Sequence, residues 1–141
     1  MSNNTTISKS IFLNTSPENV WVYLTDKDKL GQWYHPAQSD LKDGQEYQLL
    51  MTADDGSIKP IVWGKVLKMD RPNELQTTFC IEPFHNTETI LTWTLKAAAG
   101  GTRLSLEHKG IAEVTGPAAM QFLVALDAGW DKHFAGLREA I

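Results

Sequence analysis

Residues 91–108 read LTWTLKAAAGGTRLSLEH, and this stretch decides the fold class. Apolar and polar side chains alternate on both sides of the pair Gly100-Gly101. The inward-facing set is Leu91, Trp93 and Leu95 before the pair, and Leu104, Leu106 and His108 after it. Alternation with a period of two is typical of antiparallel strands with one buried face, and glycines between two such runs predict a hairpin turn. The sequence therefore predicts an antiparallel sheet, with His108 at the end of an apolar face.

The same alternation, interrupted by turn residues, extends over residues 44–109. Asp54-Asp55-Gly56 and the run 70–73 (DRPN) are turn signals. Five strands are predicted between these breaks, at 44–52, 58–69, 74–82, 87–97 and 102–109. The stretch from Thr6 to Asn14 is β-branched and apolar, which predicts one more strand and brings the sheet to about six.

Two short helices are predicted between the first strand and the others. Ser16-Pro17-Glu18 combines an N-cap residue, a proline at the first helical position and an early carboxylate, which predicts a helix over about 17–24. Thr25, followed three residues later by Asp28, is expected to cap a second helix. Gly31 is expected to end that helix in a left-handed conformation.

Residues 117–141 change to a helical period. At 100° per residue, the apolar side chains of one stripe lie within about 40° of Trp130. They are Ala119, Leu123, Leu126, Trp130, Phe134, Leu137 and Ile141. Since the sheet is the broad apolar surface available, we expect the helix to pack on it. The predicted fold is α+β, a curved antiparallel sheet wrapped around a long C-terminal helix, with a space where a bent sheet and a straight helix cannot touch.

The composition predicts one soluble domain. The chain has 141 residues, of which 42% are hydrophobic and 21% charged, with a net charge of −4 and a single cysteine. A domain of this size builds a core without disulfides or metal.

The absence of a long apolar stretch and of a signal peptide predicts no membrane insertion and a cytoplasmic location. The single cysteine agrees with this location. Scattered basic residues in an acidic chain predict no nucleic-acid partner.

Several short motifs follow one another in the order and spacing of a known family. They are Ser16-Pro17-Glu18 with Val20-Trp21, Leu24-Thr25-Asp26, Trp33-Tyr34-His35-Pro36, Gly64-Lys65-Val66, Asp70-Arg71-Pro72 with Leu75, Gly100-Gly101-Thr102-Arg103-Leu104, His108-Lys109-Gly110, and Gly129-Trp130 with Leu137. In these motifs nearly the whole chain resembles the START-like superfamily, also called SRPBCC or helix-grip. Within it, the chain is similar to the branch of the C-terminal domain of the activator of the heat-shock-protein-90 ATPase.

The resemblance implies a single helix-grip domain over residues 1–141, with the order β-α-α-β5-α. It also implies a hydrophobic pocket between the sheet and the last helix, which in relatives binds lipids, sterols, polyketides or other apolar compounds. The co-chaperone has an additional N-terminal domain that contributes to chaperone binding, whereas this chain begins at its first strand, so chaperone binding is not expected. Many relatives have two consecutive tryptophans where this chain has Trp33-Tyr34, which keeps an aromatic rim and adds a hydroxyl.

Catalytic and metal-binding motifs are absent from the sequence. The four histidines, His35, His85, His108 and His133, have no H-x-x-x-H spacing and no cysteine partner, which predicts no local metal site. We expect exposed loop histidines and, for His108, an inward ring held by one hydrogen bond. Cys80 is expected to be a buried, inert thiol. Since no glycine-rich loop leads from a strand into a helix, no nucleotide cofactor is expected, although distant residues can still assemble a site.

The five tryptophans point to a ligand pocket. Trp93 and Trp130 are predicted to face each other across the space between sheet and helix, and Trp33 to guard its mouth. Trp21 and Trp63 are expected to be ordinary packing, and His108 to orient a ligand. The candidate ligand-binding residues are Trp33, Tyr34, Phe79, Trp93, His108, Met120, Leu123, Leu126 and Trp130.

Three functions are compatible with these features. The first is a binding domain for an apolar or aromatic small molecule, present as a monomer or weak homodimer. The second is an enzyme of the polyketide cyclase or hydratase type, with His108, Tyr34 or a pocket carboxylate as acid or base. The third, an interaction module for a chaperone ATPase, rests on the resemblance by analogy.

Overall fold

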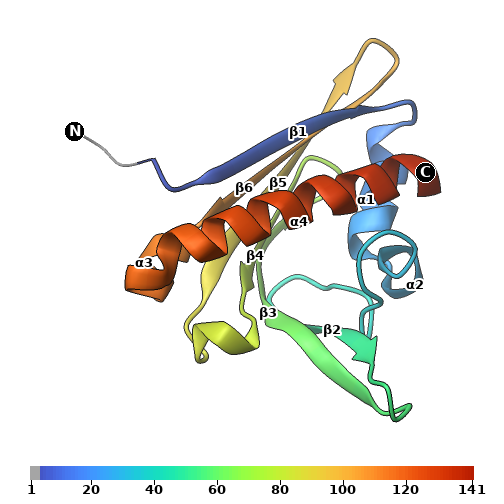
Figure 1. The fold of residues 1–141 in the computed structure, drawn as a ribbon. Helices are drawn as coiled ribbons and strands as arrows, with labels where there is room; N and C mark the ends of the chain where they lie inside the picture. The colour runs from blue at the N-terminus through green and yellow to red at the C-terminus, as the bar shows by residue number, and fades with distance from the viewer. Residues whose placement is uncertain (1–3) are drawn as a thin grey trace.

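The strands form one antiparallel sheet in the order β1-β6-β5-β4-β3-β2, and the long helix α4 crosses its inner face (Figure 1). The computed structural model describes residues 4–141. The strands are β1 (Ile7–Leu13), β2 (Glu46–Thr52), β3 (Ile58–Asp70), β4 (Glu74–Phe79), β5 (Thr89–Ala98) and β6 (Gly101–Lys109). The α-helices are α1 (Pro17–Thr25), α2 (Lys27–Leu30), α3 (Ile111–Thr115) and α4 (Ala119–Ala140), with short 3-10 helices η1 (Glu82–Phe84) and η2 (Gly116–Ala118). The predicted α+β helix-grip fold is confirmed.

The hairpin of β5 and β6 forms as the alternation predicts. Trp93 lies opposite Leu106 and Leu91 opposite His108, so the inward residues of both strands share one face. The chain turns at Ala99 and Gly100, which have φ values of 50° and 85°. Two consecutive left-handed residues match the right-handed twist of the paired strands, which explains the tight turn.

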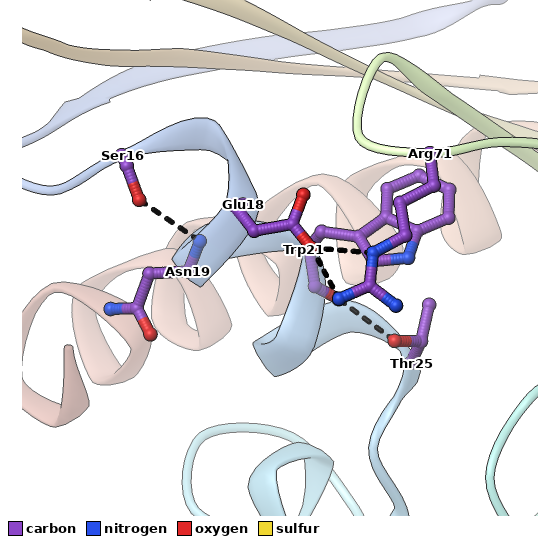
Figure 2. A network of polar contacts seen from close by, with 6 residues as sticks. All are labelled: Ser16, Glu18, Asn19, Trp21, Thr25 and Arg71. Atoms are coloured by element: carbon purple, nitrogen blue, oxygen red, sulfur yellow. Dashed lines mark hydrogen bonds and ion pairs between the residues drawn. The ribbon is translucent and has the colours of Figure 1, made fainter.

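The first helix begins as its capping signal predicts. The Ser16 hydroxyl accepts a hydrogen bond of 3.2 Å from the backbone N–H of Asn19, and Pro17 occupies the first turn. Glu18 pairs with Arg71, which lies in the turn between β3 and β4 (Figure 2). This ion pair ties the start of α1 to the sheet at an exposed position.

The cap and the end of the second helix differ from the prediction. Thr25 does not cap α2, because its hydroxyl donates a 2.9 Å hydrogen bond back to the carbonyl of Trp21 within α1 (Figure 2). Asp26 caps α2 instead, since its carboxylate accepts from the backbone N–H groups of Asp28 and Lys29. Gly31 has φ −70° and ψ −13°, a right-handed conformation, so the prediction of a left-handed end was wrong.

A short helix that the sequence did not predict, α3, precedes the C-terminal helix. Gly110 and Gly116, both with positive φ, bracket it. In α4 the buried residues Trp130, Phe134 and Leu137 face the sheet, as the helical stripe predicts. No helix in residues 4–141 is long and apolar enough to cross a membrane.

The far end of the sheet bends away from α4. The hairpin of β2 and β3 projects beyond the helix (Figure 1), and the strand register shifts at Leu49/Leu50 and again between Val66 and Lys68. Such irregularities bend a strand and increase its twist. At the opposite edge β1 stays close to α4, where Lys9 pairs with Asp127 at 2.9 Å and Asp131 at 3.0 Å. Helix α4 therefore lies close to the sheet along β1 and apart from it near β3.

Candidate ligand-binding site

Aromatic rings fill the middle of the interface between sheet and helix. The rings of Trp93 on β5 and Trp130 on α4 meet edge to face, with centroids 5.6 Å apart. Trp33 packs on Trp93 at 6.1 Å and donates its indole N–H to the carbonyl of Tyr23 at 2.9 Å. Trp33 is only 5% exposed, so it belongs to the core and does not guard a mouth as predicted.

A small cavity of about 30 Å³ lies inside the core. Four of the predicted ligand-binding residues line it, namely Trp33, Tyr34, Phe79 and Trp93. A cavity that holds one water molecule needs roughly 10 to 15 Å³, so this cavity has room for water but not for an organic ligand.

A larger groove of about 430 Å³ opens where the sheet bends away from α4. Its walls come from β3, from η1 and from α4, and most are apolar, including Ile61, Trp63, Ile81 and Leu126. Tyr34 and Phe79 line both this groove and the inner cavity, and so form the partition between the two spaces. The volume lies within the usual range of small-molecule sites.

One end of the groove carries three polar aromatic side chains. The ring centroid of Tyr34 lies 4.8 Å from that of His35 and 4.6 Å from that of His133, and the two histidine rings are 5.6 Å apart. Tyr34 and His35 follow α2, whereas His133 lies on α4, three residues after Trp130. Tertiary structure therefore brings together residues from two distant parts of the chain.

Burial keeps these three groups uncharged at neutral pH. It raises the pKa of Tyr34 well above its ordinary value of 10.0. It also lowers the pKa of His35 and of His133, the latter in addition through the charges of His35 and Lys132. The backbone of Trp33 opposes this lowering of the His133 pKa. The groove thus has neutral donors and acceptors at one end.

His108 has no free nitrogen for a ligand. The Trp130 indole donates to its Nδ1 at 3.2 Å, and its Nε2 lies 2.8 Å from the Thr89 hydroxyl. That hydroxyl donates to the carbonyl of Phe79 at 2.9 Å, so it accepts from Nε2–H and fixes the tautomer of the ring. Desolvation lowers the pKa of His108 to about 3. The ring makes two hydrogen bonds, where the sequence interpretation gave it one, and it is structural.

The remaining predicted residues lie in separate places. Leu126 lines the groove. Trp130 is buried and contacts Tyr34 at 5.3 Å, directly behind the polar end. Leu123 lines a different surface groove, between β1 and α4, and Met120 is 70% exposed near the start of the helix. Neither Leu123 nor Met120 joins the other candidates.

The groove residues His35, His133 and Trp63 were missed as site residues. His35 directly follows Tyr34, and His133 follows Trp130 by three positions, which places it on a neighbouring part of the helix face. This spacing is a signal that could have identified them. For Trp63 the sequence predicts ordinary packing, because the alternation is blurred by its apolar neighbours.

Metal chemistry has no ready site in the described part of the chain. Residues 4–141 contain no cluster of three or more histidine, cysteine, aspartate or glutamate side chains that could hold a metal ion. The Cys80 thiol is buried, and desolvation raises its pKa. The prediction of a buried cysteine is confirmed.

A protein-family model described as "Activator of Hsp90 ATPase homolog 1-like protein" matches residues 14–141. The chain belongs to this family. The Activator of Hsp90 ATPase homolog 1-like family is a branch of the START-like superfamily, so the resemblance seen in the sequence is confirmed. A search of curated proteins found no match.

Solved structures show the same fold. The protein MLL2253 from Mesorhizobium loti is 20% identical with a TM-score of 0.78, over 96% of this chain and 95% of that one. CalU16 from Micromonospora echinospora is 20% identical with a TM-score of 0.76, over 99% and 80% of the two chains. DynU16, a protein in the dynemicin biosynthetic locus, is 18% identical with a TM-score of 0.77, over 97% of this chain and 47% of that one. At these identities the matches concern the fold alone.

Proposed function

We propose that this domain binds an apolar or aromatic small molecule in the groove between β3, η1 and α4. The observation that carries the proposal is the groove of about 430 Å³, lined mostly by apolar side chains and by the cluster of Tyr34, His35 and His133. Binding sites of this kind combine an apolar lining with a few convergent polar groups. Aromatic walls such as Trp63, Phe79 and Tyr34 favour flat ligands, because rings stack on rings.

The test combines native mass spectrometry with thermal unfolding in the presence of fatty acids, sterols and polycyclic aromatics. A ligand at about 100 times its Kd stabilises the folded state by roughly 2.7 kcal/mol, which raises the Tm by about 10 °C for a domain of this size. We expect this shift with at least one of the three ligand classes. If none of them binds or raises the Tm, the proposal is wrong.

Two tryptophan substitutions on the same helix locate the site. Leu126→Trp fills the groove from α4 and is expected to abolish the ligand-induced shift. Met120→Trp enlarges a side chain that is 70% exposed away from the groove, and is expected to keep the shift. Retention of the shift in Leu126→Trp, or its loss in Met120→Trp alone, would place the ligand elsewhere.

Acid–base catalysis is a second candidate function, favoured by the convergence of Tyr34, His35 and His133 at the groove. In such a reaction the neutral His133 would take a proton from the carbon next to a carbonyl, while the Tyr34 hydroxyl would hydrogen-bond to the carbonyl oxygen. NMR of 2-tetralone in D₂O measures this step directly. Faster exchange of its α-hydrogens with wild-type protein than with His133→Phe would support catalysis, and equal rates would exclude it for this substrate class.

The interaction with a chaperone ATPase stays a prediction by analogy. The family description names an activator of such an ATPase. A pull-down combined with an ATPase assay tests it, and unchanged ATPase activity would count against it.

A further inference from the structure

The polar end of the groove has unused hydrogen-bonding capacity. Of the three tyrosines, Tyr23 donates its hydroxyl to the carbonyl of Ala140 at 3.2 Å, and Tyr47 donates to that of Thr78 at 2.5 Å. None of the hydrogen bonds found among residues 4–141 involves the hydroxyl of Tyr34, and its ring contacts the rings of His35 and His133, which also line the groove. A phenol that lines a groove and is not used within the protein is available to a ligand.

His133 complements this donor with an acceptor. In the neutral form, one of the two ring nitrogens of His133 carries a hydrogen. Because the ring is neutral, its other nitrogen carries a lone pair and can only accept a hydrogen bond. The centroids of Tyr34 and His133 are 4.6 Å apart, and both side chains line the groove. The rings that carry one donor and one acceptor therefore lie side by side in the groove.

We infer that the groove selects apolar ligands that end in a hydroxyl group, with Tyr34 donating to the hydroxyl oxygen and His133 accepting its proton in a hydrogen bond. A hydroxyl both donates and accepts, so it satisfies both side chains at once. A carboxylate only accepts, so it leaves the bare nitrogen of His133 unpaired, and removing its charge from water into a mostly apolar groove costs free energy. Lys59 and Glu82 also line the groove and carry opposite charges, so the walls give no net attraction for an anion. The inference rests on the proposed function.

Calorimetric titration with three probes that share one ring system distinguishes a preference for a hydroxyl group from binding of the apolar ring alone. The probes are naphthalene, 2-naphthol and 2-naphthoate, which differ at a single substituent. Two neutral hydrogen bonds predict that 2-naphthol binds about tenfold more tightly than naphthalene. We expect 2-naphthoate to bind more weakly than 2-naphthol.

Two variants assign the preference to its residues. Tyr34→Phe removes the donor and His133→Phe removes the acceptor, and each keeps an aromatic ring in place. Each is expected to reduce the preference for 2-naphthol over naphthalene by about threefold to tenfold, while the affinity for naphthalene stays unchanged. Tyr23→Phe, which removes a hydroxyl at the other end of the core, is the matched control and is expected to bind all three probes like the wild type.

The outcomes are distinguishable. If naphthalene binds but 2-naphthol binds no better, if 2-naphthoate binds most tightly, or if both variants keep the preference, the inference is wrong and the proposed function stands. If none of the three probes binds, the inference is overturned, whereas the proposed function is decided by the screen with fatty acids, sterols and polycyclic aromatics. Since Tyr34→Phe is a minimal change, it tests the donor even where His133→Phe lowers the Tm.

Discussion

Replacing His108 tests the hydrogen-bond chain that joins the sheet to α4. His108 is fully buried between Thr89 on β5 and Trp130 on α4, and desolvation lowers its pKa from 6.5 to about 3. In the unfolded chain the ring has its ordinary pKa. Between these two values unfolding takes up a proton, so the free energy of unfolding falls as the pH falls.

The size of the effect follows from the two pKa values. Below the unfolded pKa, one such group changes the free energy of unfolding by about 1.4 kcal/mol per pH unit. Between pH 7 and pH 5 the loss from His108 alone is therefore about 2 kcal/mol. The lowered pKa values of His35 and His133 add to the loss in the wild type, so the difference between wild type and variant isolates His108.

Urea unfolding at pH 7 and pH 5 measures this difference. His108→Asn is expected to be less stable than the wild type at pH 7 by about 2 to 4 kcal/mol, because packing and hydrogen bonds are lost, and to lose about 2 kcal/mol less on acidification. His85→Asn, at an exposed histidine whose left-handed φ of 53° suits asparagine, is the control and should keep the wild-type pH dependence. If His108→Asn loses as much stability as the wild type between pH 7 and pH 5, the ring is not held neutral and the reasoning fails.

Three further substitutions have defined outcomes in the same unfolding assay. Gly129→Ala should stabilise the protein by up to about 1 kcal/mol, since a Cβ there meets nothing within 4 Å and alanine favours the helix; destabilisation would contradict this. Gly64→Ala should destabilise by about 3 kcal/mol, because the new Cβ would lie 2.4 Å from the carbonyl oxygen of Thr78; an unchanged stability would refute the close approach. Glu18→Gln should change stability by less than about 1 kcal/mol, since the pair with Arg71 is exposed, and a larger loss would show a stronger coupling.

The strands were predictable because their pattern is local. Leu91, Trp93 and Leu95 alternate with polar residues, and Gly100 marks the turn, so both strands of the hairpin follow from neighbouring residues alone. The short helix α3 was missed because five residues are too few for a helical period to be recognised. The cap of α2 was assigned to Thr25, because adjacent capping residues look alike in a sequence. Which one caps depends on the hydrogen bond that Thr25 makes within α1.

The site was only partly predictable, because it depends on where sheet and helix separate. The register shifts at Leu49/Leu50 and between Val66 and Lys68 bend the sheet there, and neither is visible in the alternation. The sequence therefore places the ligand space at Trp93 and Trp130, where the structure has packed rings. Three of the predicted residues, Tyr34, Phe79 and Leu126, line the groove.

Methyl NMR during titration with 2-naphthol shows whether a ligand occupies the groove between β3, η1 and α4. Signals of Met51, Ile61, Ile81 and Leu126, all at the groove, are expected to shift with a common Kd. Signals of Leu104, buried in β6, and of Val124, in the groove beside β1, are expected to stay constant. Shifts at Val124 without shifts at Leu126 and Ile61, or no shifts at all, would contradict the account.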